Sequence, residues 1–307
     1  MNGLRHEACL YNGQDEFVKL MMPWVRDGIA NGDPIIAVSH SANLDALRDA
    51  LGADARQVEM RTSDSWYLSP AKSFRGFINF ASAHPNASCV RMIGEPIWPL
   101  GWAAAVREYA HYEAVFNVIA GDSPIWARCP YATSELPDAV LEHALSTHPH
   151  VNTAETSSAS GRFVEPEDYC ARLAAAMSEP AEPTEPIPVT ADLQSLCQAV
   201  AAEAAAAGVL PARLRSLQLA VHELAANALG HGDGSATLRT WTSADSFVCE
   251  VSSSGRELSE TTAGYVPINP AIGGGRGLWL VRQLCDLVEV RSRNGRNAIR
   301  VHMRRTA

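Results

Sequence analysis

The sequence predicts an α/β protein of two domains, and three observations lead to this fold class. In the first half, short apolar runs alternate with segments of helical periodicity, which is typical of a largely parallel sheet covered by helices on both faces. In the second half, helical segments come first and alternating strands follow, which predicts a mixed or antiparallel sheet with helices on one face. A proline-rich stretch separates the halves. With 307 residues, the chain is long for one core and comfortable for two.

The first half contains a continuous apolar run at residues 34–38, which is typical of a buried strand. Further strands are expected at 58–60 and 89–93. Helical spacing of apolar residues predicts helices at 16–30, 43–51, 74–83, 102–118 and 136–145.

The domain boundary is predicted from two changes in composition. Residues 152–161 are polar and small, and residues 179–188 have proline at nearly every second or third position. Proline favours extended geometry, which indicates a semi-rigid linker. We therefore expect domains at 5–150 and 189–307, joined by a linker at 151–188 that contains one short helix.

The second half begins with a helical stripe over residues 193–200, followed by a helix from Pro211 to about Leu229. Alternating apolar residues predict strands around 247–251 and 299–303. Asn294-Gly295 is a hairpin turn signal before the last strand.

Composition excludes several classes of function. The formal net charge of −9 argues against direct binding of nucleic acid, which needs a basic surface. No apolar run approaches the length of a membrane span, and the N-terminus has no secretory signal pattern. The seven cysteines are scattered and form no Cys-x-x-Cys pair, which favours reduced thiols in a cytoplasmic protein.

The most informative motif lies in the predicted helix that starts at Pro211. Glu223 and Asn227 stand four residues apart, so both lie on one face of that helix. A carboxylate there suits proton transfer, and an amide oxygen suits a hard cation such as Mg²⁺. The alternative is a helix with two polar residues that face solvent.

Downstream, residues 273–277 form a glycine-rich loop that runs into an amphipathic helix. Backbone N–H groups in such a loop, together with the positive helix N-terminus, can hold phosphates. A glycine-rich loop is weak evidence alone, but here it follows the helix with Glu223 and Asn227, a strand and a Ser-Gly turn.

With these motifs, residues of about 190 to 307 resemble the histidine-kinase-type (GHKL) ATPase fold, in particular bacterial serine kinases that act as anti-sigma factors. The resemblance implies ATP and Mg²⁺ as cofactors, Glu223 as general base and Asn227 as Mg²⁺ ligand. It implies a lid over residues 256–272. The phosphate loop would consist of Gly273, Gly274, Gly275, Arg276 and Gly277.

The family's activity is phosphorylation of a serine on a small STAS-type antagonist that otherwise frees a sigma factor. The resemblance thus implies a sigma factor and this antagonist as partners, and a role in transcription regulation under stress. A homodimer is also expected from the resemblance. No histidine on a long dimerisation helix precedes the domain, which argues against a sensor histidine kinase.

One departure concerns the adenine pocket. The family has Asp-x-Gly-x-Gly after the strand, whereas this chain has Ser253 for the aspartate, Gly255 for the first glycine and Glu257 for the second. Three interpretations stay open: a kinase with weak ATP affinity, a binding-only pseudokinase, and an altered base preference.

Residues of about 5 to 150 resemble the MEDS domain, a sensory module with a RecA-like or KaiC-like α/β core. The matching pieces include residues 6–11, 94–98, 111–117 and 129–131. No phosphate-binding loop follows the strand at 34–38, so ATP hydrolysis is not expected in this domain.

A small-molecule or metal site in the first domain would use the polar residues at the predicted strand ends and in the helix at 102–118: His6, Glu95, His111, Glu113 and Cys129. The alternative is that these residues hold the fold together by hydrogen bonds, since none of their spacings is a metal signature. Trp98, Trp102, Tyr109 and Tyr112 could line an apolar pocket or belong to the core.

Overall fold

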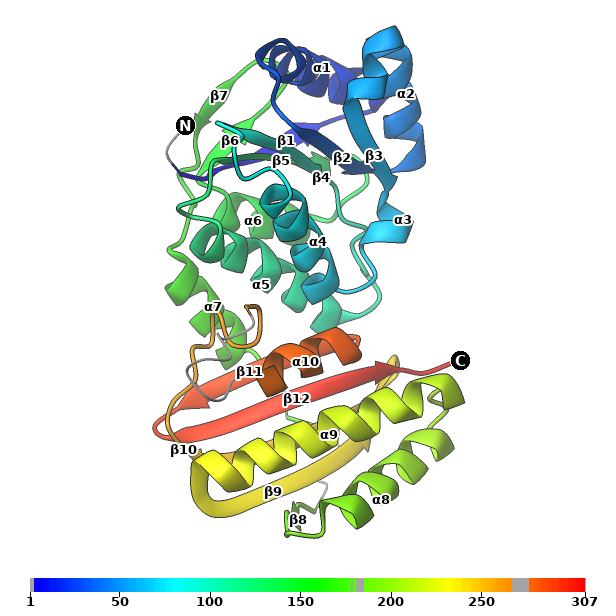
Figure 1. Cartoon of the computed structure of the whole chain (residues 1–307), viewed down its shortest axis with the longest axis vertical. Coiled ribbons are helices and arrows are strands. Elements are labelled where there is room, and N and C mark those ends of the chain that lie inside the picture. Colours follow the sequence, from blue (N-terminus) through cyan, green and yellow to red (C-terminus); the bar gives the residue numbers. More distant parts are fainter. Residues whose placement is uncertain (1–2, 178, 181–184, 267–275, 307) are drawn as a thin grey trace. The chain divides into compact units, whose positions relative to one another are not determined.

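The computed structural model describes residues 3–177, 179–180, 185–266 and 276–306 (Figure 1). The chain divides into two compact units, an N-terminal unit of residues 1–169 and a C-terminal unit of residues 170–307. None of the helices in the described ranges is both long enough and apolar enough to cross a membrane.

The N-terminal unit is built on a seven-stranded sheet with the strand order β3-β2-β4-β5-β1-β6-β7. Every pair from β3 to β6 is parallel, and the edge strand β7 is antiparallel to β6. The strands are β1 (Arg5–Tyr11), β2 (Ile35–Ser39), β3 (Val58–Thr62), β4 (Val90–Gly94), β5 (Ile125–Ala132), β6 (His150–Asn152) and β7 (Ser157–Ala159).

Helices cover both faces of this sheet (Figure 1). On one face lie α1 (Gln14–Asn31) and α2 (Ser41–Leu51); on the other lie α4 (Pro70–Ser82), α5 (Ala103–Ile119) and α6 (Asp138–Thr147). The short α3 (Ser63–Trp66) follows β3, and the 3-10 turn η1 (Gly52–Gln57) precedes β3.

Side-chain alternation in β1 divides its residues between the two helical layers. Cys9 and Tyr11 belong to the core that α1 and α2 build with the sheet. His6 is on the opposite face, where it lines a small cavity with Phe116 of α5. The sheet therefore directs His6 toward the α5 layer.

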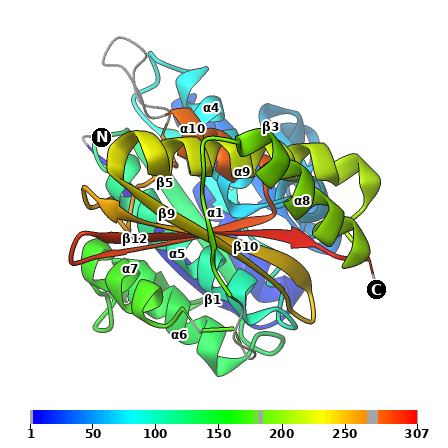
Figure 2. The same ribbon diagram turned by 90° about the horizontal axis from the view of Figure 1, so that it is seen from below.

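The C-terminal unit contains a five-stranded antiparallel sheet with the order β11-β12-β10-β9-β8. Its strands are β8 (Ile187–Pro188), β9 (Gly232–Thr242), β10 (Ser246–Gly255), β11 (Leu287–Arg293) and β12 (Arg296–Arg304). One face packs against α8 (Leu193–Ala206), α9 (Pro211–His231) and α10 (Arg276–Leu284), as Figure 2 shows. The shared core contains fully buried side chains from α9 and the strands, such as Leu217, Cys249 and Val301.

The predicted fold class is confirmed: the first sheet is parallel apart from its edge strand, and the second is antiparallel with helices on one face. The Asn294-Gly295 signal also forms its turn. Both residues have positive φ, 54° and 70°, which joins β11 to β12 as a two-residue hairpin requires.

The segment predicted as a linker, residues 151–188, contains regular structure. Part of β6 and all of β7, α7 (Pro166–Ala175) and β8 fall within it. A serine-rich sequence can form β7 because this strand is an exposed edge whose side chains face water.

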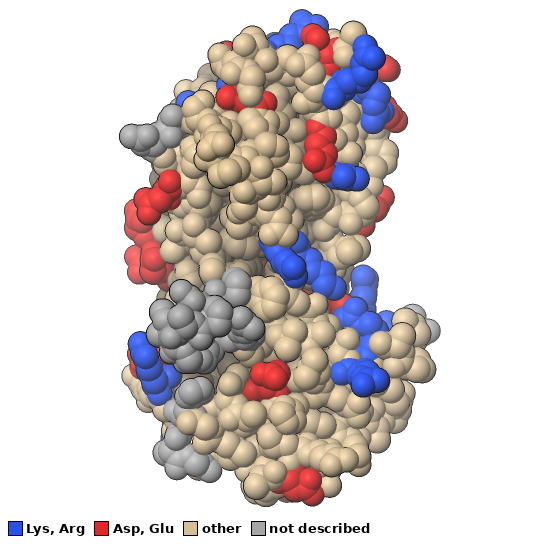
Figure 3. Space-filling view, viewed as in Figure 1, with Lys and Arg blue, Asp and Glu red and all other residues tan. Residues whose placement is uncertain are grey.

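Acidic and basic side chains lie in small separate groups on the face shown in Figure 3, with large uncharged areas between them. On that face of each unit, the net negative charge of the chain is therefore spread out rather than gathered into one patch.

Candidate functional site

Helix α9 brings the predicted polar pair to the edge of the core. Its buried stripe includes Leu217, Val221 and Leu224, each at most 2% exposed. Glu223 and Asn227 flank this stripe and are partly exposed. A carboxylate and an amide one turn apart therefore stand beside the core and reach solvent.

Gly277, in the first turn of α10, lies directly against this pair. A Cβ atom at residue 277 would come within 2.5 Å of Asn227 Nδ2 and 2.9 Å of Glu223 Oε2, distances that real Cβ atoms essentially never show. The structure thus brings Glu223, Asn227 and Gly277 together at the N-terminus of α10, although about 50 residues of sequence separate them.

Ser253 lies near the end of β10, between Ala236 on β9 and Asn297 on β12. By alternation it is on the same sheet face as Cys249 and Val251, the face that α9 covers. The pairing of β10 with β9 becomes irregular between Ser253 and Gly255, at the end of the strand.

Glu257, in the position of the second glycine, has a local partner. Its Oε1 accepts a hydrogen bond from the backbone N–H of Gly295, 3.0 Å away in the β11–β12 turn. The described part of the predicted lid, residues 256–266, also packs on α10: Arg282 Nε donates to the carbonyl of Ala263 (2.8 Å), and its guanidinium lies 4.2 Å from the Tyr265 ring centroid.

The other predicted phosphate-loop residues cannot be placed in the same way. Gly273, Gly274 and Gly275 lie outside the described residues, and Arg276 is described only as the first residue of α10. What is described suits a nucleotide: a glycine without room for a side chain at a helix N-terminus, facing a carboxylate and an amide.

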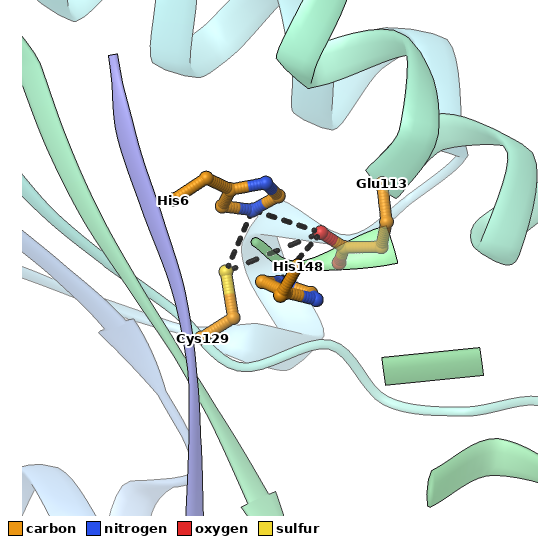
Figure 4. Close-up of side chains that lie close together, drawn as sticks. All are labelled: His6, Glu113, Cys129 and His148. Atoms are coloured by element: carbon orange, nitrogen blue, oxygen red, sulfur yellow. Dashed lines mark hydrogen bonds and ion pairs between the residues drawn. The ribbon is translucent and has the colours of Figure 1, made fainter. Parts of the chain in front are cut away.

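In the N-terminal unit, three of the five predicted sensor residues meet (Figure 4). His6 Nε2 of β1 lies 3.4 Å from Cys129 Sγ of β5 and 3.3 Å from Glu113 Oε2 of α5. His148, directly after α6, completes the group with its Nε2 3.6 Å from the same carboxylate oxygen. We call these four residues the His-Cys cluster, and all four are buried.

Sequence reasoning missed His148 because its position after a helix carries no motif. The remaining two predicted residues lie elsewhere. Glu95 accepts hydrogen bonds from Tyr11 (2.5 Å), Asn43 (3.1 Å) and Ser39, which makes it the centre of a separate buried network. Burial and the Glu95 carboxylate together raise the pKa of Tyr11.

His111 does not belong to the His-Cys cluster either, and its Nδ1 lies 3.8 Å from Glu108 Oε1 on the preceding turn of α5. The four aromatic residues considered for a pocket are buried, at 4–8% exposure: Trp98, Trp102, Tyr109 and Tyr112. Tyr109 donates a hydrogen bond to the Tyr67 carbonyl (3.0 Å), and burial raises the pKa of this phenol.

The C-terminal unit, an antiparallel sheet with helices on one face, has the architecture of a histidine kinase-like ATPase domain. A family model described as histidine kinase-like ATPase domain matches residues 188–303. A second model, MEDS (MEthanogen/methylotroph, DcmR Sensory domain), matches residues 5–149. The chain thus couples a MEDS sensory domain to a histidine kinase-like ATPase domain, for which ATP and Mg²⁺ are the ligands in general. No curated protein matches the chain.

Proposed function

We propose that this protein is a bacterial regulator of the anti-sigma type. Its C-terminal unit would bind Mg·ATP, hold a sigma factor, and phosphorylate a serine on a STAS-type antagonist, under control of the N-terminal sensory unit. The observation that carries the proposal is the contact of Gly277 with Glu223 and Asn227 within a histidine kinase-like ATPase domain.

Each of these residues has a role that its chemistry supports. Asn227 Oδ1 would be a ligand for Mg²⁺, which prefers oxygen ligands. The backbone N–H of Gly277 and the N-terminus of α10 would hold phosphate oxygens. Glu223 would take the proton from the attacking serine hydroxyl, a role that contributes about 10²- to 10⁴-fold to rate. When bound, ATP supplies the phosphoryl group that is transferred.

Ser253 would make ATP binding weak. A hydrogen bond to a charged acceptor contributes about 1.5–3 kcal/mol, so a serine in place of aspartate weakens binding by about ten- to a hundredfold. A Ser253→Asp variant is expected to recover affinity, because it restores a charged acceptor for the adenine amino group.

A second candidate function is that of a pseudokinase, which would exchange partners by protein contact alone. The observation in its favour is that two positions of the adenine-binding loop depart from the family, with Glu257 bonded to the β11–β12 turn instead. A further candidate, a receptor acting through the N-terminal unit, has the His-Cys cluster in its favour.

The experiment that tests the kinase uses the full chain, Mg·ATP labelled on its γ-phosphate, and purified STAS-type proteins from the same genome. Labelled phosphoserine on one of them, lost in Glu223→Gln, supports the proposal. The neighbouring His222→Gln is the matched control, since His222 is exposed on the same helix. If the chain binds ATP but transfers no phosphate, the result favours the pseudokinase. If Glu223→Gln still transfers phosphate, Glu223 is not the general base.

A further inference from the structure

We propose that the His-Cys cluster of His6, Glu113, Cys129 and His148 is a zinc site. This proposal is independent of the ATP chemistry of the other unit. Each residue offers one ligand atom, and all four atoms lie within 4.8 Å of one another. The ligands come from four separate pieces of the fold: β1, α5, β5 and the residue after α6 (Figure 4).

Most of the known separations among the four ligand atoms are close to the edges of a zinc coordination tetrahedron. Zinc binds nitrogen and oxygen at about 2.0–2.2 Å and sulfur at about 2.3 Å, so the edges of its coordination tetrahedron are about 3.3–3.8 Å long. Four of the six separations are 3.3 Å (His6–Glu113), 3.4 Å (His6–Cys129), 3.6 Å (His148–Glu113) and 4.0 Å (Cys129–Glu113), and the two that join His148 to His6 and to Cys129 are at most 4.8 Å. A small contraction would complete the coordination.

Hydrogen bonds at the far side of each imidazole direct a lone pair into the cluster. Asn117 Nδ2 donates to the carbonyls of Glu113 (3.3 Å) and Thr147 (2.7 Å), so its Oδ1 is the atom that faces His6. His6 Nδ1 therefore donates to Asn117 Oδ1 at 3.0 Å, which leaves the lone pair on Nε2.

Hydrogen bonding fixes the tautomer of His148 in the same way. Its Nδ1 lies 2.8 Å from the carbonyl of Ala144, which can only accept, so Nδ1 carries the proton. Its Nε2 then has a lone pair, is fully buried, and has no hydrogen-bond partner. A buried acceptor without a partner is unfavourable by about 1–3 kcal/mol, and a metal ion would satisfy it.

Charge balance also suits zinc. Zinc would displace the thiol proton to solvent and bind a thiolate, a carboxylate and two neutral imidazoles. The two negative ligands cancel the charge of the ion, so the filled site is neutral and compatible with burial.

The size of the site favours an ion over an organic ligand. The cavity beside the cluster is lined by His6, Glu113 and Cys129 together with apolar side chains such as Phe77 and Met92, but not by His148, and has a volume of about 10 Å³. This is near the lower limit for one water molecule, far below the volume that a drug-sized molecule fills.

The test uses the full chain, expressed with zinc and desalted, and then depleted and loaded with Co²⁺. We expect about one zinc per chain and, with Co²⁺, visible bands plus a sulfur-to-cobalt charge-transfer band. Cys129→Ser should abolish the charge-transfer band, and His148→Gln should lower zinc affinity at least about tenfold. Cys89→Ser, a buried cysteine outside the cluster, should leave both signals unchanged.

Circular dichroism identifies variants that do not fold. If a variant does not fold, the zinc content and the Co²⁺ spectrum of the wild-type chain alone test the proposal. Wild-type chain that retains no zinc and develops no charge-transfer band overturns the proposal. Equally, full zinc retention by folded Cys129→Ser and His148→Gln variants would overturn it, because the ion would then be bound elsewhere.

Discussion

Gly277 and Glu223 are in such close contact that a methyl group on the glycine would lie 2.9 Å from the glutamate Oε2. The start of α10 and the polar edge of α9 therefore share one small space. An ATP site at this place depends on the absence of a side chain at residue 277.

Gly277→Ala is expected to reduce Mg·ATP affinity by at least about tenfold, because the methyl group displaces Asn227 and Glu223. Gly230→Ala is the matched control. Gly230 is in α9, and a Cβ there meets nothing within 4 Å, so this change should leave ATP binding intact and stabilise the helix slightly. Equal affinities of the two variants would show that the contact has no role in binding.

Asn117→Ala tests the orientation of His6. Removing the acceptor of the His6 Nδ1 proton should weaken zinc binding by about ten- to a hundredfold, because the ring loses its fixed tautomer and direction. Competition with a chromophoric chelator gives the affinity. An affinity equal to that of the wild type in folded Asn117→Ala protein would contradict this role.

His143 should make the N-terminal unit less stable at acidic pH. Burial lowers its pKa below 6.5, the neighbouring Glu142 opposes this shift, and its Nδ1 lies 2.6 Å from Tyr169 Oη. The unfolded chain therefore takes up this proton at a higher pH than the folded chain. The contribution of His143 to stability is fully present above a pH of about 6.5. It is lost as the pH falls from there toward the lowered pKa of the folded state.

Urea unfolding of the wild type and His143→Gln between neutral pH and pH of about 5 measures this contribution. The variant should lose less stability over that interval. Parallel curves for the two proteins would show that His143 does not contribute.

Arg91 should be among the most important charges for the stability of the N-terminal unit. Its buried guanidinium bonds Asp33 Oδ2 (2.7 Å), Asp27 and the Trp24 carbonyl. Arg91→Met leaves Asp33 buried and unpaired, which should lower the free energy of unfolding by about 3–5 kcal/mol.

Arg61→Ala removes an exposed ion pair with Glu59 and should change stability by less than about 1 kcal/mol. Denaturant midpoints of the two variants give the comparison. Similar small losses in both would contradict a structural role for the Arg91 network.

Local patterns predicted much of the fold and the shared helix face of two candidate site residues. Pro211 begins α9 as expected, and the four-residue spacing of Glu223 and Asn227 places both on one face of it. Asn294-Gly295 forms its turn for the same reason, because the signal lies in adjacent residues.

Long-range convergence could not be predicted in this way. His148 joins His6 because β1 pairs with both β5 and β6, a consequence of strand order that no local pattern encodes. The sequence groups Glu95 with His6, yet Glu95 accepts hydrogen bonds from Tyr11 and Asn43, which hold it in a separate network.

The central claim, that the C-terminal unit binds Mg·ATP at Glu223, Asn227 and Gly277, is tested most directly by calorimetric titration of Mg·ATP into the full chain. The account predicts saturable binding of about one nucleotide per chain, weakened in Asn227→Ala and unchanged in Gln218→Ala on the same helix. No heat, and no rise in melting temperature at millimolar Mg·ATP, would contradict it.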